Sequence, residues 1–206
     1  MIGLTDAFAL LGWALLVCAV SSRLQPLRSV NSLVLKGLLF ATFTAFLIPV
    51  FGAGLPLAGF FRGIGGDLSI TLLALSVWSL AHCLVGAANL ARREHTALLV
   101  LVSAAALLLY PTALGWGNWD AYRLGWGSWV FLSALLLVCA ASAWLGLRVV
   151  PALIALALLA WSFGLMESGN LWDYLLDPFL SAYALVFVFI KCWQSAYRRF
   201  VNRSPH

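Results

Sequence analysis

Charged residues are scarce in this chain of 206 residues: they make up 9% of it, whereas hydrophobic residues make up 64%. A water-soluble domain of this length needs a larger polar fraction to cover its surface. The mean hydropathy is +1.01, and long apolar runs follow one another with short polar breaks. The composition therefore excludes a soluble globular protein. It predicts an all-α integral membrane protein, organised as a single transmembrane helical domain over residues 1–206.

Paired cysteines and clustered metal ligands are lacking as well. Each cysteine stands alone in an apolar run, at Cys18, Cys83, Cys139 and Cys192. Since no Cys-x-x-Cys pair occurs, we expect buried thiols rather than a disulfide or metal framework. His82 lies within an apolar run with no acid at its depth, which favours a hydrogen-bonded structural role. We expect no metal site and no cofactor.

The apolar runs are long enough to predict seven transmembrane spans, because a spanning helix needs about 20 apolar residues and about 17 at the least. The first run follows a start without Lys or Arg, so we expect it to be retained as a span rather than removed as a signal peptide. The predicted spans cover residues 4–21, 33–53, 69–91, 96–114, 128–147, 150–166 and 178–196.

The breaks between the spans alternate in charge. One side holds Glu94 and ten cations: Arg23, Arg28, Lys36, Arg92, Arg93, Arg148, Lys191, Arg198, Arg199 and Arg203. The other side holds two cations and six acids: Arg62, Arg123, Asp6, Asp67, Asp120, Glu167, Asp173 and Asp177. The positive-inside rule then places the C-terminus in the cytoplasm and the N-terminus outside. Because the cations follow this topology, we expect them to meet anionic lipids, and we expect no nucleic-acid partner.

Three outer segments are rich in Gly, Trp and acids. We name them loop A (residues 52–69), loop B (115–128) and loop C (167–178). Loop A is expected to lie in the membrane interface or to re-enter the membrane. Trp and Tyr in such loops are typical of the aromatic belt at the headgroup level.

The candidate site is a polar cluster formed by these loops at the outer membrane boundary. Its expected ligand- or partner-binding residues are Arg62, Asp67, Asp120, Tyr122, Arg123, Glu167, Asn170, Trp172, Asp173, Tyr174 and Asp177. If loop C is one helix, Asn170, Asp173 and Asp177 share a face. Arg62 and Arg123 are then the natural counter-ions of these acids.

Helix capping is the simpler explanation for some of these residues. Asp177 precedes Pro178, which is the pattern of an N-cap followed by a proline at the first helical position. Asp67 and Ser69 are candidate caps of the third span, and Ser128 is one for the fifth.

Two functions of different classes fit the pattern. The first is a non-enzymatic accessory or scaffold subunit of a bacterial envelope-biogenesis or lipid-modifying system in the inner membrane, which binds lipid and another membrane or periplasmic protein through the acidic, Trp-rich outer face. The alternative is a membrane-embedded enzyme that acts on a phosphate-bearing lipid headgroup, with Glu167, Asp173 or Asp120 as catalytic groups and an arginine on the phosphate. Transport of a small solute or ion is the third hypothesis. It ranks below the other two because a transport path needs polar groups near mid-membrane, and the predicted spans carry only scattered polar residues.

Overall fold

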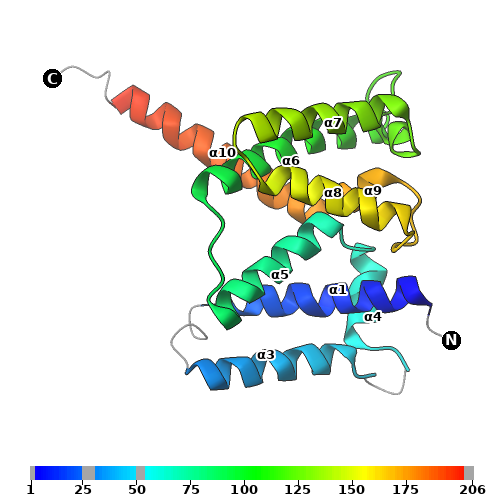
Figure 1. The fold of residues 1–206 in the computed structure, drawn as a ribbon, viewed down its shortest axis with the longest axis vertical. Coiled ribbons are helices and arrows are strands. Elements are labelled where there is room, and N and C mark those ends of the chain that lie inside the picture. The colour runs from blue at the N-terminus through cyan, green and yellow to red at the C-terminus, as the bar shows by residue number, and fades with distance from the viewer. Residues whose placement is uncertain (1–2, 25–30, 50–53, 202–206) are drawn as a thin grey trace. The chain divides into compact units, whose positions relative to one another are not determined.

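The computed structural model describes residues 3–24, 31–49 and 54–201, and these residues form helices joined by turns, with no strand. The prediction of an all-helical chain is confirmed. The helices are α1 Leu4–Ser21, α3 Ser32–Leu47, α4 Leu57–Gly65, α5 Ile70–Val85, α6 Arg92–Ala113, the 3-10 helix η1 Ala121–Gly125, α7 Trp129–Trp144, α8 Val149–Ser162, α9 Leu171–Leu175 and α10 Pro178–Val201 (Figure 1).

The chain folds into two compact units. The first unit draws on Met1–Leu90 and Ala152–Leu175, and the second on Ala91–Pro151 and Leu176–His206. Each unit therefore combines two segments that are distant in the sequence. That the whole chain forms a single transmembrane domain stays a prediction.

Helix α1 is the centre of the first unit, where it packs against α3, α4 and α5 (Figure 1). Its buried residues are mostly small: Ala9, Gly12, Trp13, Ala14, Cys18 and Ala19. Small residues let two helices approach closely. At Gly12, an added Cβ would come within 3.0 Å of a methyl group of Leu73 on α5. The sequence of α1 thus suits a helix surrounded by other helices.

Helix α5 is shorter than the predicted third span, residues 69–91. It starts at Ser69, whose hydroxyl accepts a hydrogen bond from the Leu72 N–H at 3.1 Å. It ends at Gly86, which has a φ of 70° and closes the helix in the left-handed conformation that glycine adopts without strain. The span prediction was therefore too long at this end, because Gly86 was read as part of an apolar run. His82 Nδ1 lies 2.7 Å from the Ala87 carbonyl oxygen, which is the structural role expected of it.

In the second unit, α6 packs against α10. The hydroxyl groups of Tyr110 and Ser181 lie 3.3 Å apart across this contact. At the start of α6, the Glu94 carboxylate accepts hydrogen bonds from the N–H groups of Arg148 and Val149, at 2.7 and 3.2 Å. Glu94 thereby fixes the turn between α7 and α8, so the chain has a break between two helices where the sequence predicts one.

Three helices are long and apolar enough to cross a membrane: Leu4–Ser21, Arg92–Ala113 and Pro178–Arg199. Four shorter apolar helices are Ser32–Leu47, Ile70–Val85, Trp129–Trp144 and Val149–Ser162. Each of these seven helices overlaps one of the seven predicted spans. The end of the second span (50–53) and the cations Arg28 and Arg203 lie outside the described residues.

The cysteines bear out the sequence analysis only in part. All four are free. Cys18 is buried and Cys83 and Cys139 are half-buried, but Cys192 is exposed on α10, so the expectation that it is buried was wrong. The physical reason is that Cys192 lies in the last turns of α10, where residues 191–199 are exposed throughout.

Candidate functional site

The centre of the candidate site in the first unit is Arg62, on the short helix α4. This helix joins the core through Ala58, which is fully buried, and through Phe61, whose ring lies 5.6 Å from that of Trp13. Both residues anchor α4 against α1. Loop A was expected to lie in the interface or to re-enter, and in its described part it forms this nine-residue amphipathic helix and a turn.

Each of the three guanidinium nitrogens of Arg62 meets a different carboxylate. Nη1 lies 2.6 Å from an oxygen of Asp6, Nε lies 2.7 Å from one of Asp67, and Nη2 lies 2.8 Å from one of Glu167. Asp6 belongs to α1, Asp67 to the turn after α4, and Glu167 to the turn after α8. A planar guanidinium with five fixed donors is suited to hold several acceptors in this way. Arg62 therefore joins three segments of the first unit. We name these four residues the Arg62 cluster.

The cluster is more buried at its centre than at its edge. The side chain of Arg62 is 17% exposed and that of Asp67 is 14% exposed, whereas Asp6 and Glu167 are 40% and 65% exposed. Partial burial acts to lower the pKa of Arg62, but the hydrogen bonds to Asp6, Asp67 and Glu167 outweigh it and raise the pKa above its ordinary value. One cation and three anions give the cluster a net charge of −2. The excess negative charge is carried by the two exposed acids.

Backbone groups tie the same region together. The second oxygen of Asp67 accepts a hydrogen bond from the Glu167 N–H at 3.4 Å. The indole N–H of Trp13 donates to the Gly66 carbonyl at 3.0 Å. The turns that carry Asp67 and Glu167 are thus held against α1 by contacts other than ion pairs.

In loop C, hydrogen bonds hold the polar residues to their own backbone. The Asn170 side chain accepts from the Trp172 N–H at 3.0 Å, and the Ser168 hydroxyl donates to Asp173. The Tyr174 hydroxyl accepts from the Met166 N–H at 3.2 Å and donates to the Met166 carbonyl at 3.4 Å. Asn170, Trp172 and Tyr174 are buried. These three candidate residues shape the turn from inside, and Glu167 is the member of loop C that is presented outward.

The expectation that Asn170, Asp173 and Asp177 share a helix face was wrong. Helix α9 ends at Leu175, and Asp177 starts the next helix. Its carboxylate accepts a hydrogen bond from the Leu180 N–H at 2.8 Å, so the predicted N-cap of α10 is confirmed. Asp177 caps a new helix, so residues 170–177 do not form the continuous helix that would place the three side chains on one face.

The other capping predictions have mixed outcomes. Ser69 caps α5 as predicted. Asp67 does not supply this cap and is an ion-pair partner of Arg62 instead. Ser128 occupies the N-cap position of α7, but its side chain makes no capping hydrogen bond.

The candidate residues of loop B belong to the second unit. Asp120 accepts a hydrogen bond from the Tyr122 N–H at 2.9 Å and thereby starts η1. The Tyr122 ring meets the Trp126 ring edge-on at 6.5 Å. Arg123 is exposed. Three exposed tryptophans surround this short helix, at Trp116, Trp119 and Trp126. Loop B therefore has an exposed surface that is rich in Trp.

Asp6 is the member of the Arg62 cluster that was missing from the candidate list. The charge alternation assigned Asp6 to the same side as Arg62, but the two residues lie 56 positions apart in the sequence. One feature of the sequence could have identified Asp6: it is a single acid in the first turn of an apolar helix, and an acid in such a position usually has a cationic partner. Within the described residues, no group of three or more His, Cys, Asp or Glu side chains is arranged to hold a metal ion.

Comparison with known proteins gives no significant match: none to a family model, none to a curated protein and none to a solved structure.

Proposed function

We propose that this chain is a multi-pass protein of a bacterial inner membrane with seven membrane-crossing helices, its N-terminus outside and its C-terminus in the cytoplasm. In this proposal it is a non-enzymatic scaffold subunit of an envelope-biogenesis or lipid-modifying system. It binds a partner protein through its acidic, Trp-rich outer face.

The exposed apolar surfaces of the helices support the membrane part of the proposal. Helix α7 buries Phe131 and Ser142, while Leu136, Leu137 and Trp144 are exposed, the last of them by 92%. Contiguous apolar surface of this kind is unstable in water and stable in lipid. Helix α3 shows the same pattern, with Leu33 and Phe40 exposed.

The shorter helices need a specific explanation. A helix of 14 residues such as α8 is about 21 Å long, less than the hydrocarbon thickness of about 30 Å. Local thinning of the bilayer and non-helical residues that are packed against protein both extend the reach of such a segment. We therefore retain all seven helices as spans.

Charge separation within each unit supports the orientation. In the first unit, the Arg62 cluster lies at the start of α1, and Arg23 lies just past its end, where it donates a hydrogen bond to Ser79. In the second unit, Asp120 is near the end of α6, whereas Arg92 and Arg93 are at its start. In each unit most cations lie at one end of these helices, and the positive-inside rule assigns that end to the cytoplasm.

The Arg62 cluster is the observation that carries the scaffold proposal. Each nitrogen of its guanidinium already meets a carboxylate, and the excess negative charge around it disfavours a substrate phosphate. The cluster builds a fixed surface with an excess charge of −2, and Glu167 and Asp6 are exposed on it. Such a surface favours a partner with a basic segment and steers it by complementary charge.

The test compares partner binding and lipid chemistry in the same cells. The tagged protein is purified in a mild detergent, and the co-purifying proteins and lipids are identified. Purification is then repeated with the double variant Asp120→Asn, Glu167→Gln and with the control Arg148→Gln, which changes one exposed charge at the basic end. Asparagine keeps the capping function of Asp120, so the double variant retains the fold.

We expect the double variant to lose a partner that the control retains, at an unchanged protein level and without accumulation of an unmodified lipid. Retained partner binding together with a changed lipid profile would contradict the scaffold and favour the enzyme. The orientation has its own test: a reporter fused after His206 that proves to be periplasmic would overturn it.

A further inference from the structure

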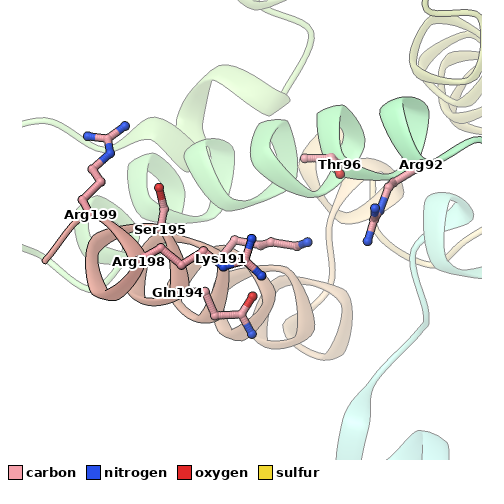
Figure 2. A pocket seen from close by; sticks show the side chains of 7 residues that line it. All are labelled: Arg92, Thr96, Lys191, Gln194, Ser195, Arg198 and Arg199. Atoms are coloured by element: carbon pink, nitrogen blue, oxygen red, sulfur yellow. The ribbon is translucent and has the colours of Figure 1, made fainter. Parts of the chain in front are cut away.

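A basic pocket lies in the second unit, between α6 and the last turns of α10. Its volume is about 700 Å³, within the range of about 300–1,000 Å³ that is typical of small-molecule sites. Figure 2 shows its lining side chains, two from α6 and five from α10: Arg92, Thr96, Lys191, Gln194, Ser195, Arg198 and Arg199. We name it the basic pocket.

Helical spacing brings these side chains together. Arg92 and Thr96 are four residues apart on α6. On α10, Gln194, Ser195 and Arg198 follow Lys191 by three, four and seven residues. Both spacings place side chains on one face of a helix. The pocket is thus formed by two polar faces of helices that pack against each other in the unit.

The four cations of the basic pocket have no carboxylate to balance them among the residues that the structure describes. Every ion pair among the described residues involves Arg62, which belongs to the first unit. Glu94, near Arg92 in the sequence, directs its carboxylate to the N–H groups of Arg148 and Val149. Four like charges around one cavity repel one another, and a bound anion would remove this repulsion.

The chemistry of the lining suits phosphate. Three guanidinium groups offer forked donors for phosphate oxygens, and Lys191 adds a compact point charge. Thr96, Gln194 and Ser195 supply neutral donors. The pocket also includes Arg92, the first residue of a 22-residue helix, and the N-terminus of a helix attracts anions.

We propose that the basic pocket binds a phosphate-bearing anion, and that its source is the headgroup of an anionic membrane lipid. The apolar part of α10 leads directly to the pocket. Phe189 and Trp193 are exposed on either side of Lys191 in the sequence, and their rings stack at 6.4 Å. Exposed aromatic residues beside cations are typical of a helix end at the headgroup level. A soluble phosphate compound shares the same chemistry, so the test separates the two sources.

The test uses the full-length protein in nanodiscs of phosphatidylcholine with or without phosphatidic acid, and in detergent with each lipid added. Bound lipid is counted by native mass spectrometry. Inorganic pyrophosphate is the soluble competitor. The pocket variants are Lys191→Gln and Arg198→Gln, and the matched control is Arg148→Gln, which removes one exposed cation outside the pocket. All three positions are exposed, so the variants are expected to fold, and a cooperative unfolding transition in each variant verifies this.

We expect the affinity for phosphatidic acid over phosphatidylcholine to fall about fivefold in each pocket variant, since one cation near a membrane surface contributes about 1 kcal/mol. The control should bind as the wild type does, and pyrophosphate should compete weakly. Strong competition by pyrophosphate, with the same loss in the pocket variants, would overturn the lipid source and favour a soluble phosphate ligand. Equal binding by all variants, or an equal loss in the control, would overturn the basic pocket as a site.

Discussion

Arginine has opposite surroundings in the two polar regions of this protein. In the Arg62 cluster one guanidinium is held by three carboxylates at 2.6–2.8 Å. In the basic pocket three arginines and a lysine line a single cavity, and the described residues provide no carboxylate for them. The first arrangement satisfies its arginine within the protein, and the second leaves its cations available to an external anion.

The difference shows what each region can do. A half-buried guanidinium is stable only when it is paired, because burial of an unpaired charge is costly. Arg62 is therefore a structural residue whose removal affects folding. The pocket cations are exposed, and water already solvates them. Their removal should affect binding and leave folding intact.

Removal of Arg62 is expected to have the largest effect. In Arg62→Met the apolar chain remains, but Asp6, Asp67 and Glu167 lose their shared cation and repel one another. We expect the free energy of unfolding to fall by about 3 kcal/mol, with an intermediate loss in Arg62→Lys, which keeps the charge but not the fork of donors. Thermal unfolding in detergent measures both. A wild-type unfolding temperature for Arg62→Met would show that the cluster contributes nothing to stability.

The three carboxylates of the cluster are predicted to be unequal. Asp67 is 14% exposed and also accepts the Glu167 N–H, whereas Glu167 is 65% exposed. Asp67→Asn should reduce stability by about 1–2 kcal/mol, and Glu167→Gln by less than about 0.5 kcal/mol, because an exposed ion pair contributes little. Chemical or thermal denaturation of the two variants under the same conditions shows which one loses more stability. The reverse order would contradict the central role of Asp67.

Capping residues provide a prediction outside both regions. Asp177→Ala removes the acceptor of the Leu180 N–H and should cost about 1 kcal/mol. Ser128→Ala is the matched control, because Ser128 has the same position on α7 without a capping hydrogen bond, and it should be nearly neutral. The unfolding temperatures of the two variants show whether the capping hydrogen bond accounts for the difference. Equal losses would mean that the capping hydrogen bond of Asp177 does not stabilise α10.

The positions of the helices were largely predictable from the sequence, since apolar runs separated by charge determine where helices start and stop. The limits of α1 were predicted without error, and the turn between α7 and α8 followed from Arg148 and Pro151. The end of α5 was missed because a single glycine ended the helix inside an apolar run. The short helices α4 and α9 were missed because they are too short to show a reliable period.

Three of the four residues of the Arg62 cluster were among the predicted candidates, but their ion pairs were not predictable from the sequence. Arg62, Asp67 and Glu167 were identified by their scarcity and their shared side. The identity of the ion-pair partners depends on tertiary packing, which brings Asp6 to a residue 56 positions away. The basic pocket was not identified because its cations were interpreted together with all the cations of that side, as residues that follow the membrane topology and meet anionic lipids. The spacing of Lys191, Ser195 and Arg198 marked a common face, but the contribution of α6 required the structure.

Removal of a cation from the basic pocket is expected to have the smallest effect on stability, and its sign should be opposite to that of removing Arg62. Arg198→Gln removes one of four like charges, so at low salt the free energy of unfolding should rise by a few tenths of a kcal/mol, about 0.3 kcal/mol. In Lys191→Gln this gain is offset, because the variant also loses the contact between the Lys191 ammonium and the Phe187 ring, 5.6 Å away. This gain should vanish at about 1 M salt, where exposed charges are screened within about 3 Å. The loss in Arg62→Met should persist there, because its ion pairs are partly shielded from solvent. Thermal unfolding of the lipid-free protein at two salt concentrations measures whether each variant is more or less stable than the wild type. Destabilisation of Arg198→Gln at low salt would mean that the pocket cations, like Arg62, hold the fold together, and the distinction between the two regions would be lost.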